Sequence, residues 1–294
     1  MRKLILLLFI TALFALAACG NTEEGAEDNS KEQVSDEKET IVFGQTSWTS
    51  AEAPTQIAKQ ILEEAGFDVE ITLLTQPVIF EGLKSGEVDV FMDAWLPYTE
   101  AELWDQYKSD LQKVATSYEN APLGWVVPSY VDINSIEELK GNAEKFDGKV
   151  YTIGAGAGIV GISEDVMKDY SLDGFELAPS SEPAMMGALD SAIKDEEPII
   201  ITGWRPHAMF AKYDLKLLEE PKENFKYDNV YVISYQGLEE KHPEAYDILS
   251  KWSIDVDYLE DMMLAYEKDG VSFEDSAKKW IKEHRDQVDK MLGK

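Results

Sequence analysis

Strand-like and helix-like segments alternate along this chain, and the same order of elements occurs twice. Strand, helix, strand, helix and strand follow one another over 41–95 and again over 149–204. The first helix is clear because Ile57, Ile61 and Leu62 are apolar at helical spacing. Alternation of this kind predicts largely parallel strands joined by right-handed crossovers. We therefore expect an α/β protein with two similar lobes.

The folded region is expected to divide into three segments. Pro128 breaks the strand-like run LGWVVP, so we place the first lobe at 41–128 and the second lobe at 129–228. The remaining segment, 229–294, begins with a strand pattern and continues as helices. We expect this segment to return to the first lobe.

The N-terminus has the pattern of a bacterial lipoprotein signal. Arg2 and Lys3 precede an apolar run that ends in Leu-Ala-Ala-Cys, and Cys19 is the only cysteine of the chain. We expect 1–18 to be a signal peptide and Cys19 to be lipidated, which anchors a protein without spanning the bilayer. The plain alternative is a secretory signal with an incidental cysteine. Residues 19–40 are acidic and poor in large apolar side chains, which predicts a disordered tether.

The charge of the chain limits its partners. Acidic residues number 57 and basic residues 27, and the basic count falls to 25 when the signal is removed. Such an excess of negative charge argues against nucleic acid and against anionic membrane surfaces as partners. We expect a monomeric folded body outside the cytoplasm, held at the cell membrane by lipid.

Three tryptophans stand where strand-like runs end and turns begin. Trp48 follows the first strand, Trp95 closes the third, and Trp204 closes the corresponding strand of the second series. Ligands of open α/β sheets bind beyond the carboxyl ends of strands, so these three indoles are expected to line one cleft between the lobes. Aromatic faces attract a cation that has no N–H to donate, such as a quaternary ammonium group. The alternative is that each indole only fills the edge of its lobe.

A glycine-rich segment opens the second lobe. The residues GAGIVG at 156–161 fit a dinucleotide fingerprint, with Glu176 about 20 residues after its start. That fingerprint belongs in the first βα unit, however, and this chain is expected to leave the cytoplasm. Small residues at a helix N-terminus also bind a carboxylate through their backbone N–H groups, for which Gly158 and Ile159 are the best donors. A turn that only permits close packing is the remaining interpretation.

A cation site opposite an anion site describes a small zwitterion such as glycine betaine. The stretches IVFGQTSWTS, VDVFMDAWLP, IGAGAGIVGISEDVMKDY and PIIITGWRPHAMF resemble the glycine betaine/proline betaine-binding lipoproteins of bacterial osmoprotectant ABC importers. The resemblance covers about 41–284. It implies a type II periplasmic-binding-protein-like fold that closes around its ligand, and as partners a membrane permease and its ATPase subunit.

The resemblance also implies roles for individual residues. Trp48, Trp95 and Trp204 would surround the methylated cation, and the amides of Gly158 and Ile159 would bind the carboxylate. Some relatives carry a histidine five residues after the second tryptophan, near the carboxylate. This chain has Glu100 at that position, which leaves the fine specificity open.

Other residues carry weaker signals. Glu100 and His207 are the secondary candidates for ligand contact. His207 is interpreted mainly as a residue that steadies the turn after Trp204 or the hinge, and Arg205 as a surface ion-pair residue rather than a ligand contact. The three histidines have no metal-ligand spacing, and no nucleophile motif has supporting context. We expect no enzymatic activity, no cofactor and no metal. The other four tryptophans are expected in the core: Trp104, Trp125, Trp252 and Trp280.

Alternative functions remain open at this stage. Carnitine, choline, proline betaine and dimethylsulfoniopropionate also carry a methylated onium group. The sequence does not indicate which of these ligands is preferred. A sensing lipoprotein of the same fold would have the same site. A secreted dinucleotide-dependent oxidoreductase is the most distant alternative.

Overall fold

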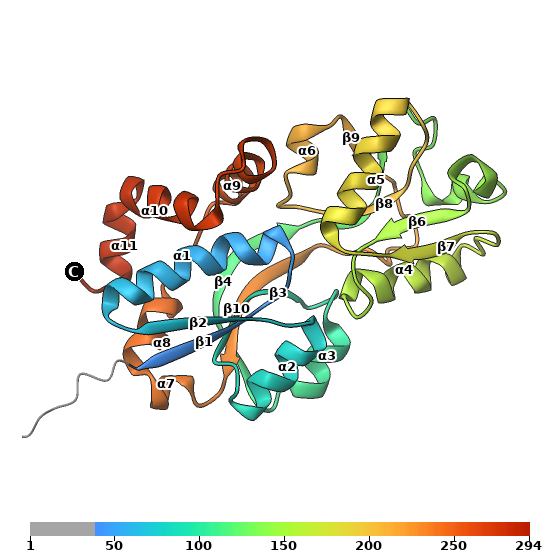
Figure 1. Ribbon diagram of the computed structural model, residues 1–294. Helices are drawn as coiled ribbons and strands as arrows, with labels where there is room; N and C mark the ends of the chain where they lie inside the picture. The colour runs from blue at the N-terminus through green and yellow to red at the C-terminus, as the bar shows by residue number, and fades with distance from the viewer. Residues whose placement is uncertain (1–38) are drawn as a thin grey trace, which may run out of the picture. The chain divides into compact units, whose positions relative to one another are not determined.

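Two five-stranded sheets form the framework of the protein, and helices cover both faces of each sheet (Figure 1). The computed structural model describes residues 39–294. The signal peptide expected at 1–18, the lipidated Cys19 and nearly all of the tether expected at 19–40 lie outside the described residues. Within the described range, no helix is long and apolar enough to cross a membrane.

The first sheet combines three parallel strands with two antiparallel pairings. In sheet order, its strands are β2 (Asp68–Leu73), β1 (Thr40–Gln45), β3 (Val90–Leu96), β10 (Asp228–Tyr235) and β4 (Leu111–Ala121). β1 pairs in parallel with β2 and β3, whereas β10 pairs antiparallel with β3 and β4. The sequence analysis did not identify β4, because its residues LQKVATSYENA do not alternate regularly between apolar and polar side chains.

The second sheet has the same number of strands. In sheet order, they are β7 (Glu176–Pro179), β6 (Lys149–Thr152), β8 (Ile201–Trp204), β5 (Leu123–Pro128) and β9 (Leu215–Leu217). β6 pairs in parallel with β7 and β8, and β5 pairs antiparallel with β8 and β9. The expected boundary at 128 assigned β5 to the first lobe, which differs from this pairing. The sequence of a strand between two sheets does not specify which sheet it joins.

The first lobe consists of the first sheet and eight helices among the described residues. They are α1 (Thr49–Ala65), α2 (Gln76–Ser85), α3 (Ala101–Tyr107), α7 (Leu238–Lys241), α8 (Pro243–Ser250), α9 (Val256–Asp269), α10 (Phe273–Glu283) and α11 (Arg285–Met291). α1 packs against α9 and α10. The chain after Asp228 thus contributes a central strand to the first sheet and helices to the same lobe.

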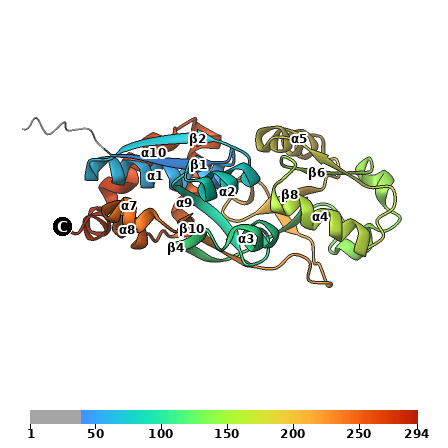
Figure 2. The same cartoon turned by 90° about the horizontal axis from the view of Figure 1, so that it is seen from below.

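The second lobe consists of the second sheet and shorter helical segments. They are the 3₁₀ helices η1 (Ile136–Leu139) and η2 (Ala143–Phe146) and the α-helices α4 (Gly158–Asp169), α5 (Glu182–Asp195) and α6 (Met209–Lys212). α4 and α5 lie on opposite faces of the sheet, as the view from below shows (Figure 2). This arrangement brings the N-terminus of α4 to the side that faces the first lobe.

The core follows the apolar pattern of the sequence. Ile57, Ile61 and Leu62 of α1 are fully buried, as their spacing predicts. The helix ends at Gly66, which takes a φ of 108° that a residue with a Cβ rarely adopts. Burial of this apolar face holds α1 on the sheet and thereby fixes the position of the loop between β1 and α1.

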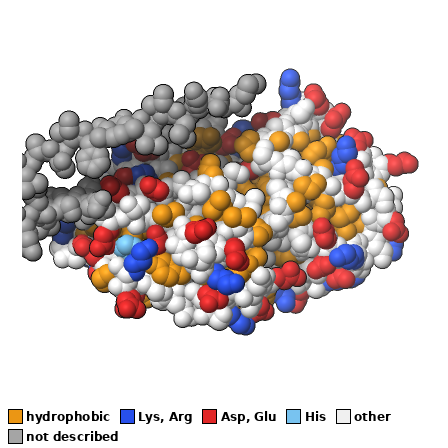
Figure 3. All heavy atoms as spheres, turned by 60° about the horizontal axis from the view of Figure 1, so that its bottom comes forward, with side chains coloured by type: hydrophobic (Ala, Val, Ile, Leu, Met, Phe, Trp, Pro, Cys, Tyr) orange, Lys and Arg blue, Asp and Glu red, His pale blue; other side chains and the backbone are white. Residues whose placement is uncertain are grey.

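The surface carries the acidic excess of the chain. Acidic side chains are spread over the face shown in Figure 3, with Lys, Arg and hydrophobic side chains between them. On this face, charges of both signs are mixed and no basic patch for nucleic acid is visible.

Candidate functional site

A cavity lies between the two lobes, at the strand ends that the sequence analysis singled out. Its volume is about 30 Å³, which leaves no room for a dinucleotide. The residues that line it are Trp48, Ser50, Gln76, Trp95, Thr99, Glu100, Leu123, Ile153, Ala157, Gly158, Ile159 and Trp204.

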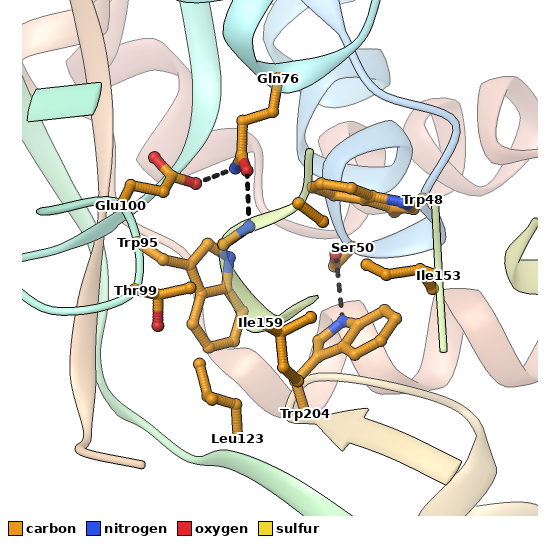
Figure 4. Close-up of a pocket in the computed structure, with 12 residues that line it drawn as sticks. Trp48, Ser50, Gln76, Trp95, Thr99, Glu100, Leu123, Ile153, Ile159 and Trp204 are labelled. Carbon is orange, nitrogen blue, oxygen red and sulfur yellow. Dashed lines mark hydrogen bonds between the residues drawn. The ribbon is translucent and has the colours of Figure 1, made fainter. Parts of the chain in front are cut away.

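The three selected tryptophans share this one cavity (Figure 4). Trp48 directly precedes α1, and Trp95 is the penultimate residue of β3, so the first lobe supplies two indoles. Trp204 ends β8 and supplies the third from the second lobe. Trp95 and Trp204 are each 5% exposed, and Trp48 is half-buried. The structure thus brings the three indoles together at one cavity.

The remaining tryptophans lie outside the cavity. Trp125, Trp252 and Trp280 are buried in the core, as expected. Trp125 donates its indole N–H to Ser163 Oγ at 2.9 Å. Trp104 is only half-buried against the smaller apolar cluster beneath α2 and α3.

Hydrogen bonds behind two of the indoles fix how their rings face the cavity. Trp95 Nε1 donates to Asp93 Oδ1 at 2.9 Å, and Trp204 Nε1 donates to Ser50 Oγ at 3.3 Å. Ser50 Oγ in turn donates to Asp93 Oδ2 at 3.2 Å. Burial raises the pKa of Asp93 to about 6, despite the hydrogen bonds from Trp95 and Ser50. Asp93 therefore places a carboxylate behind the rings at neutral pH, where it adds to the attraction for a cation.

A second buried acid joins the two lobes beside Trp204. Glu182, at the start of α5, accepts hydrogen bonds from Thr49 N at 3.1 Å and from Thr49 Oγ1 at 2.7 Å. His207 Nε2 lies 3.1 Å from Glu182 Oε1, and His207 Nδ1 accepts from Met209 N at 3.0 Å. Because Nδ1 accepts, the ring proton is on Nε2 and is donated to Glu182.

His207 also touches the cavity wall from behind. Its ring meets that of Trp204 edge-on, with centroids 5.0 Å apart. His207 is not among the residues that line the cavity, and its contact with Trp204 suits a role in steadying that turn. Arg205, in the same turn, is exposed and lies 3.8 Å from Glu260, which agrees with a surface ion pair.

The N-terminus of α4 forms the polar end of the cavity. Gly158 and Ile159 are its first two residues, and the first N–H groups of a helix have no partner within the helix. Gly158 N donates to Gln76 Oε1 at 3.2 Å, so a side-chain oxygen of the first lobe meets the amide that we expect to bind a carboxylate. The positive end of the helix dipole favours negative charge at this place.

The backbones of the two lobes lie close together at Gly158. A Cβ added there would lie 2.2 Å from the carbonyl oxygen of Thr99. Thr99 is held in turn by Asp228, whose Oδ2 accepts from Thr99 N at 3.0 Å and from Thr99 Oγ1 at 2.5 Å. Position 158 therefore requires glycine in this arrangement of the lobes, because any larger side chain would clash with Thr99.

Glu100 lines the same end of the cavity and is 2% exposed. Its Oε1 accepts a hydrogen bond from Gln76 Nε2. Burial is the main cause that raises the pKa of Glu100 well above its ordinary value, and the nearby carboxylates of Asp93 and Asp228 add to it. The residue expected to be secondary thus lies at the cavity wall.

Sequence reasoning missed several residues of the site. Ser50, Gln76 and Thr99 line the cavity, and Asp93 and Glu182 support it from behind. The place of two of these residues in the sequence could have identified them. Gln76 begins the helix after β2, and Thr99 lies in the loop after β3. Their polar side chains follow strand ends, as the tryptophans do.

The glycine-rich segment does not form a dinucleotide site here. Gly156 takes a φ of 98° in the turn before α4, and Thr99 lies over the start of the helix, where a pyrophosphate would have to bind. Glu176 is exposed at the start of β7. Among residues 39–294, no group of His, Cys, Asp and Glu side chains is arranged to hold a metal ion.

Comparison with known proteins places the chain in one family. The family model described as the substrate binding domain of ABC-type glycine betaine transport systems matches residues 39–283. The glycine betaine/carnitine transport binding protein GbuC of Listeria monocytogenes is 41% identical over 150 residues. That match covers half of this chain and half of the Listeria protein.

Two solved structures have a similar fold. Lactococcal OpuAC, in a closed conformation with glycine betaine, has a TM-score of 0.82 and 37% identity over 87% of this chain and 100% of its own. An ABC-transporter choline binding protein in complex with choline also has a TM-score of 0.82, with 25% identity over 86% of this chain and 91% of its own. The expected two-lobed, type II binding-protein fold is confirmed. The chain belongs to the family of substrate-binding domains of ABC-type glycine betaine transport systems.

Proposed function

We propose that this protein captures glycine betaine, or a related methylated onium solute, between Trp48, Trp95 and Trp204 and supplies it to an ABC importer. The observation that carries the proposal is that three indoles from two lobes line one cavity whose far end is a helix N-terminus. Both charged ends of a small zwitterion thereby find a complementary group.

The cation end relies on dispersion and on the quadrupoles of the rings. A trimethylammonium group has no N–H, so it gains little from carbonyl or carboxylate acceptors and much from aromatic faces. Each indole contributes roughly 0.5–2 kcal/mol, depending on how dry the site is. The buried carboxylates of Asp93 and Glu182 behind the rings add attraction for the cation without contacting it.

The anion end relies on the first amides of α4. A ligand carboxylate at Gly158 N and Ile159 N would replace the oxygen of Gln76 as the acceptor. Because Gly158 and Ile159 belong to the second lobe and Trp48 and Trp95 to the first, a bound zwitterion would hold the lobes together. Closure around the ligand follows from this division of contacts.

The partners and the location are part of the proposal. A permease and its ATPase would receive the solute, which serves osmoprotection. The N-terminal pattern supports a protein outside the cytoplasm that is anchored through a lipidated Cys19. Labelling with an azide-tagged fatty acid tests the anchor, and Cys19→Ala should abolish the label and release the protein from membranes.

A titration that follows tryptophan fluorescence tests the ligand class. Glycine betaine, proline betaine, carnitine, choline and dimethylsulfoniopropionate form the panel, and glycine is the control because it has the same carboxylate without methyl groups. Saturable binding of at least one methylated solute, with none of glycine, is expected. Equal responses to glycine betaine and glycine would overturn the proposal.

Choline is the second candidate, and one residue of the cavity bears on it. Choline has a hydroxyl group in place of a carboxylate, and an ionised Glu100 could accept a hydrogen bond from that hydroxyl. The protonation state of Glu100 therefore decides between the two ligand classes.

A further inference from the structure

The carboxyl group of Glu100 is half satisfied at the wall of the cavity. Oε1 accepts a hydrogen bond from Gln76 Nε2, while Oε2 is buried without a hydrogen-bond partner among the described residues. Buried polar atoms without a partner are rare and costly, which indicates a group outside the chain as the partner. The residue is 2% exposed and lines the cavity, so a ligand bound in the cavity can supply that partner.

Glu100 lies at the anion end of the cavity. Gln76 bridges it to the N-terminus of α4, because the same amide group donates to Glu100 and accepts from Gly158 N (Figure 4). Trp204, whose N–H is bonded to Ser50, lies on the far side from Glu100 (Figure 4). A carboxylate bound at the start of α4 would therefore lie beside Glu100.

The charges around Glu100 are negative. Asp93 on β3 and Asp228 at the start of β10 are the charged side chains that act on it, and both disfavour its ionised form. Gln76 on α2 and the amides of α4 are neutral groups, and Thr99 presents a carbonyl and a methyl group to the start of α4. No Lys, Arg or His of the described chain lines this cavity. Burial without a cationic partner favours the neutral acid, which has an O–H to donate.

We propose that Glu100 determines specificity by binding the ligand carboxylate as a neutral acid, with the O–H of Oε2 donating the hydrogen bond. This inference rests on the proposed function and identifies the residue that recognises the carboxylate of the ligand. An ionised Glu100 would instead repel that carboxylate and favour a ligand with a hydroxyl donor. Binding of a betaine then requires the proton on Glu100, so affinity falls as pH rises and Glu100 ionises.

The test is a calorimetric titration with glycine betaine between pH 5 and pH 9.5, on the wild type and on Glu100→Gln. Glutamine is neutral at every pH and keeps an N–H donor. The two proteins should bind with similar affinity at pH 5, and the variant should bind at least about tenfold more tightly than the wild type at pH 9.5. Asp93 is present in both proteins, so the ratio of their affinities isolates Glu100.

The outcomes separate this inference from the proposed function. A ratio that stays constant over the pH range, or a variant that binds at least tenfold more weakly at every pH, overturns the role of Glu100. Choline binding that strengthens with pH in the wild type, and does not do so in Glu100→Gln, supports it, because an ionised Glu100 accepts the hydrogen bond of the choline hydroxyl. If no methylated solute binds the wild type at any pH, the proposed function itself has failed.

Discussion

The indole N–H of Trp204, in the second lobe, donates a hydrogen bond to Ser50 Oγ of the first lobe at 3.3 Å. The same serine donates to Asp93, which also accepts the N–H of Trp95. One serine and one aspartate thus orient two rings of the cavity from different lobes. The geometry of the aromatic site and the closeness of the lobes are consequently coupled.

The contact at Gly158 gives the sharpest prediction about closure. In Gly158→Ala the new methyl group would lie 2.2 Å from the carbonyl oxygen of Thr99, so the lobes cannot approach as they do here. We expect glycine betaine to bind about ten- to a hundredfold more weakly, while the lobes themselves stay folded. Calorimetric titration and circular dichroism measure the two effects.

Gly161→Ala is the matched control for that variant. Gly161 lies in the same helix, and a Cβ there would meet nothing within 4 Å. Affinity should be unchanged, and the free energy of unfolding should rise by roughly 0.5–1 kcal/mol because alanine favours the helix. Equal affinity of both alanine variants and the wild type would mean that ligand binding does not need the approach at Gly158.

Glu182 should stabilise the closed arrangement through Thr49. Thr49→Ala removes the 2.7 Å hydrogen bond between Thr49 Oγ1 and the buried carboxylate of Glu182. Hydrogen bonds to charged groups contribute about 1.5–3 kcal/mol, so we expect glycine betaine affinity to fall about tenfold or more. The melting temperature of the protein with and without ligand provides the readout, and the shift caused by ligand should shrink. A ligand-induced shift equal to that of the wild type would contradict the account of Glu182.

Trp204 should contribute directly to the affinity. Trp204→Ala removes one aromatic face from the cavity, and we expect a loss of at least roughly 1–2 kcal/mol in binding. Trp104→Ala is the control, because Trp104 is half-buried outside the cavity. Titration calorimetry measures the affinity of both variants for glycine betaine. A similar loss of affinity in Trp204→Ala and Trp104→Ala would mean that general destabilisation, and not the missing ring in the cavity, causes the effect.

Asp93 should make stability depend on pH. Its folded pKa of about 6 lies above the ordinary pKa of an aspartate, so the folded state binds the proton more tightly than the unfolded chain does. Stability therefore rises as the pH falls through about 6 and levels off near 4. Urea unfolding at pH 7 and pH 5 should show the wild type gaining about 1 kcal/mol relative to Asp93→Asn. An identical pH response in the two proteins would contradict the assigned burial of a titrating Asp93.

Local patterns predicted much of the fold, and they failed where pairing is long-range. The apolar spacing of Ile57, Ile61 and Leu62 sufficed to predict α1. The strand Leu123–Pro128 was recognisable, but its partners in β8 and β9 lie about 80 to 90 residues later, and no local feature points to them. β4 was missed because neighbours in the sheet, rather than its own alternation, make it a strand.

The site shows the same contrast between local patterns, which could be predicted, and long-range contacts, which could not. Tryptophans at strand ends and small residues before a helix were visible as a pattern, so the wall of the cavity could be predicted. Glu182 looked like an ordinary acid in the first turn of a helix, and its partner Thr49 is 133 residues away. Gln76 meets Gly158 across the lobes, at a separation of 82 residues. Contacts of this kind follow from the placement of the lobes and have no local signature.

A crystal structure of the protein with glycine betaine tests the central claim most directly. The account predicts the trimethylammonium group between the rings of Trp48, Trp95 and Trp204, with the carboxylate at the amides of Gly158 and Ile159 and within hydrogen-bond distance of Glu100. A ligand bound outside this cavity, or bound with its carboxylate against the indole rings, would contradict it.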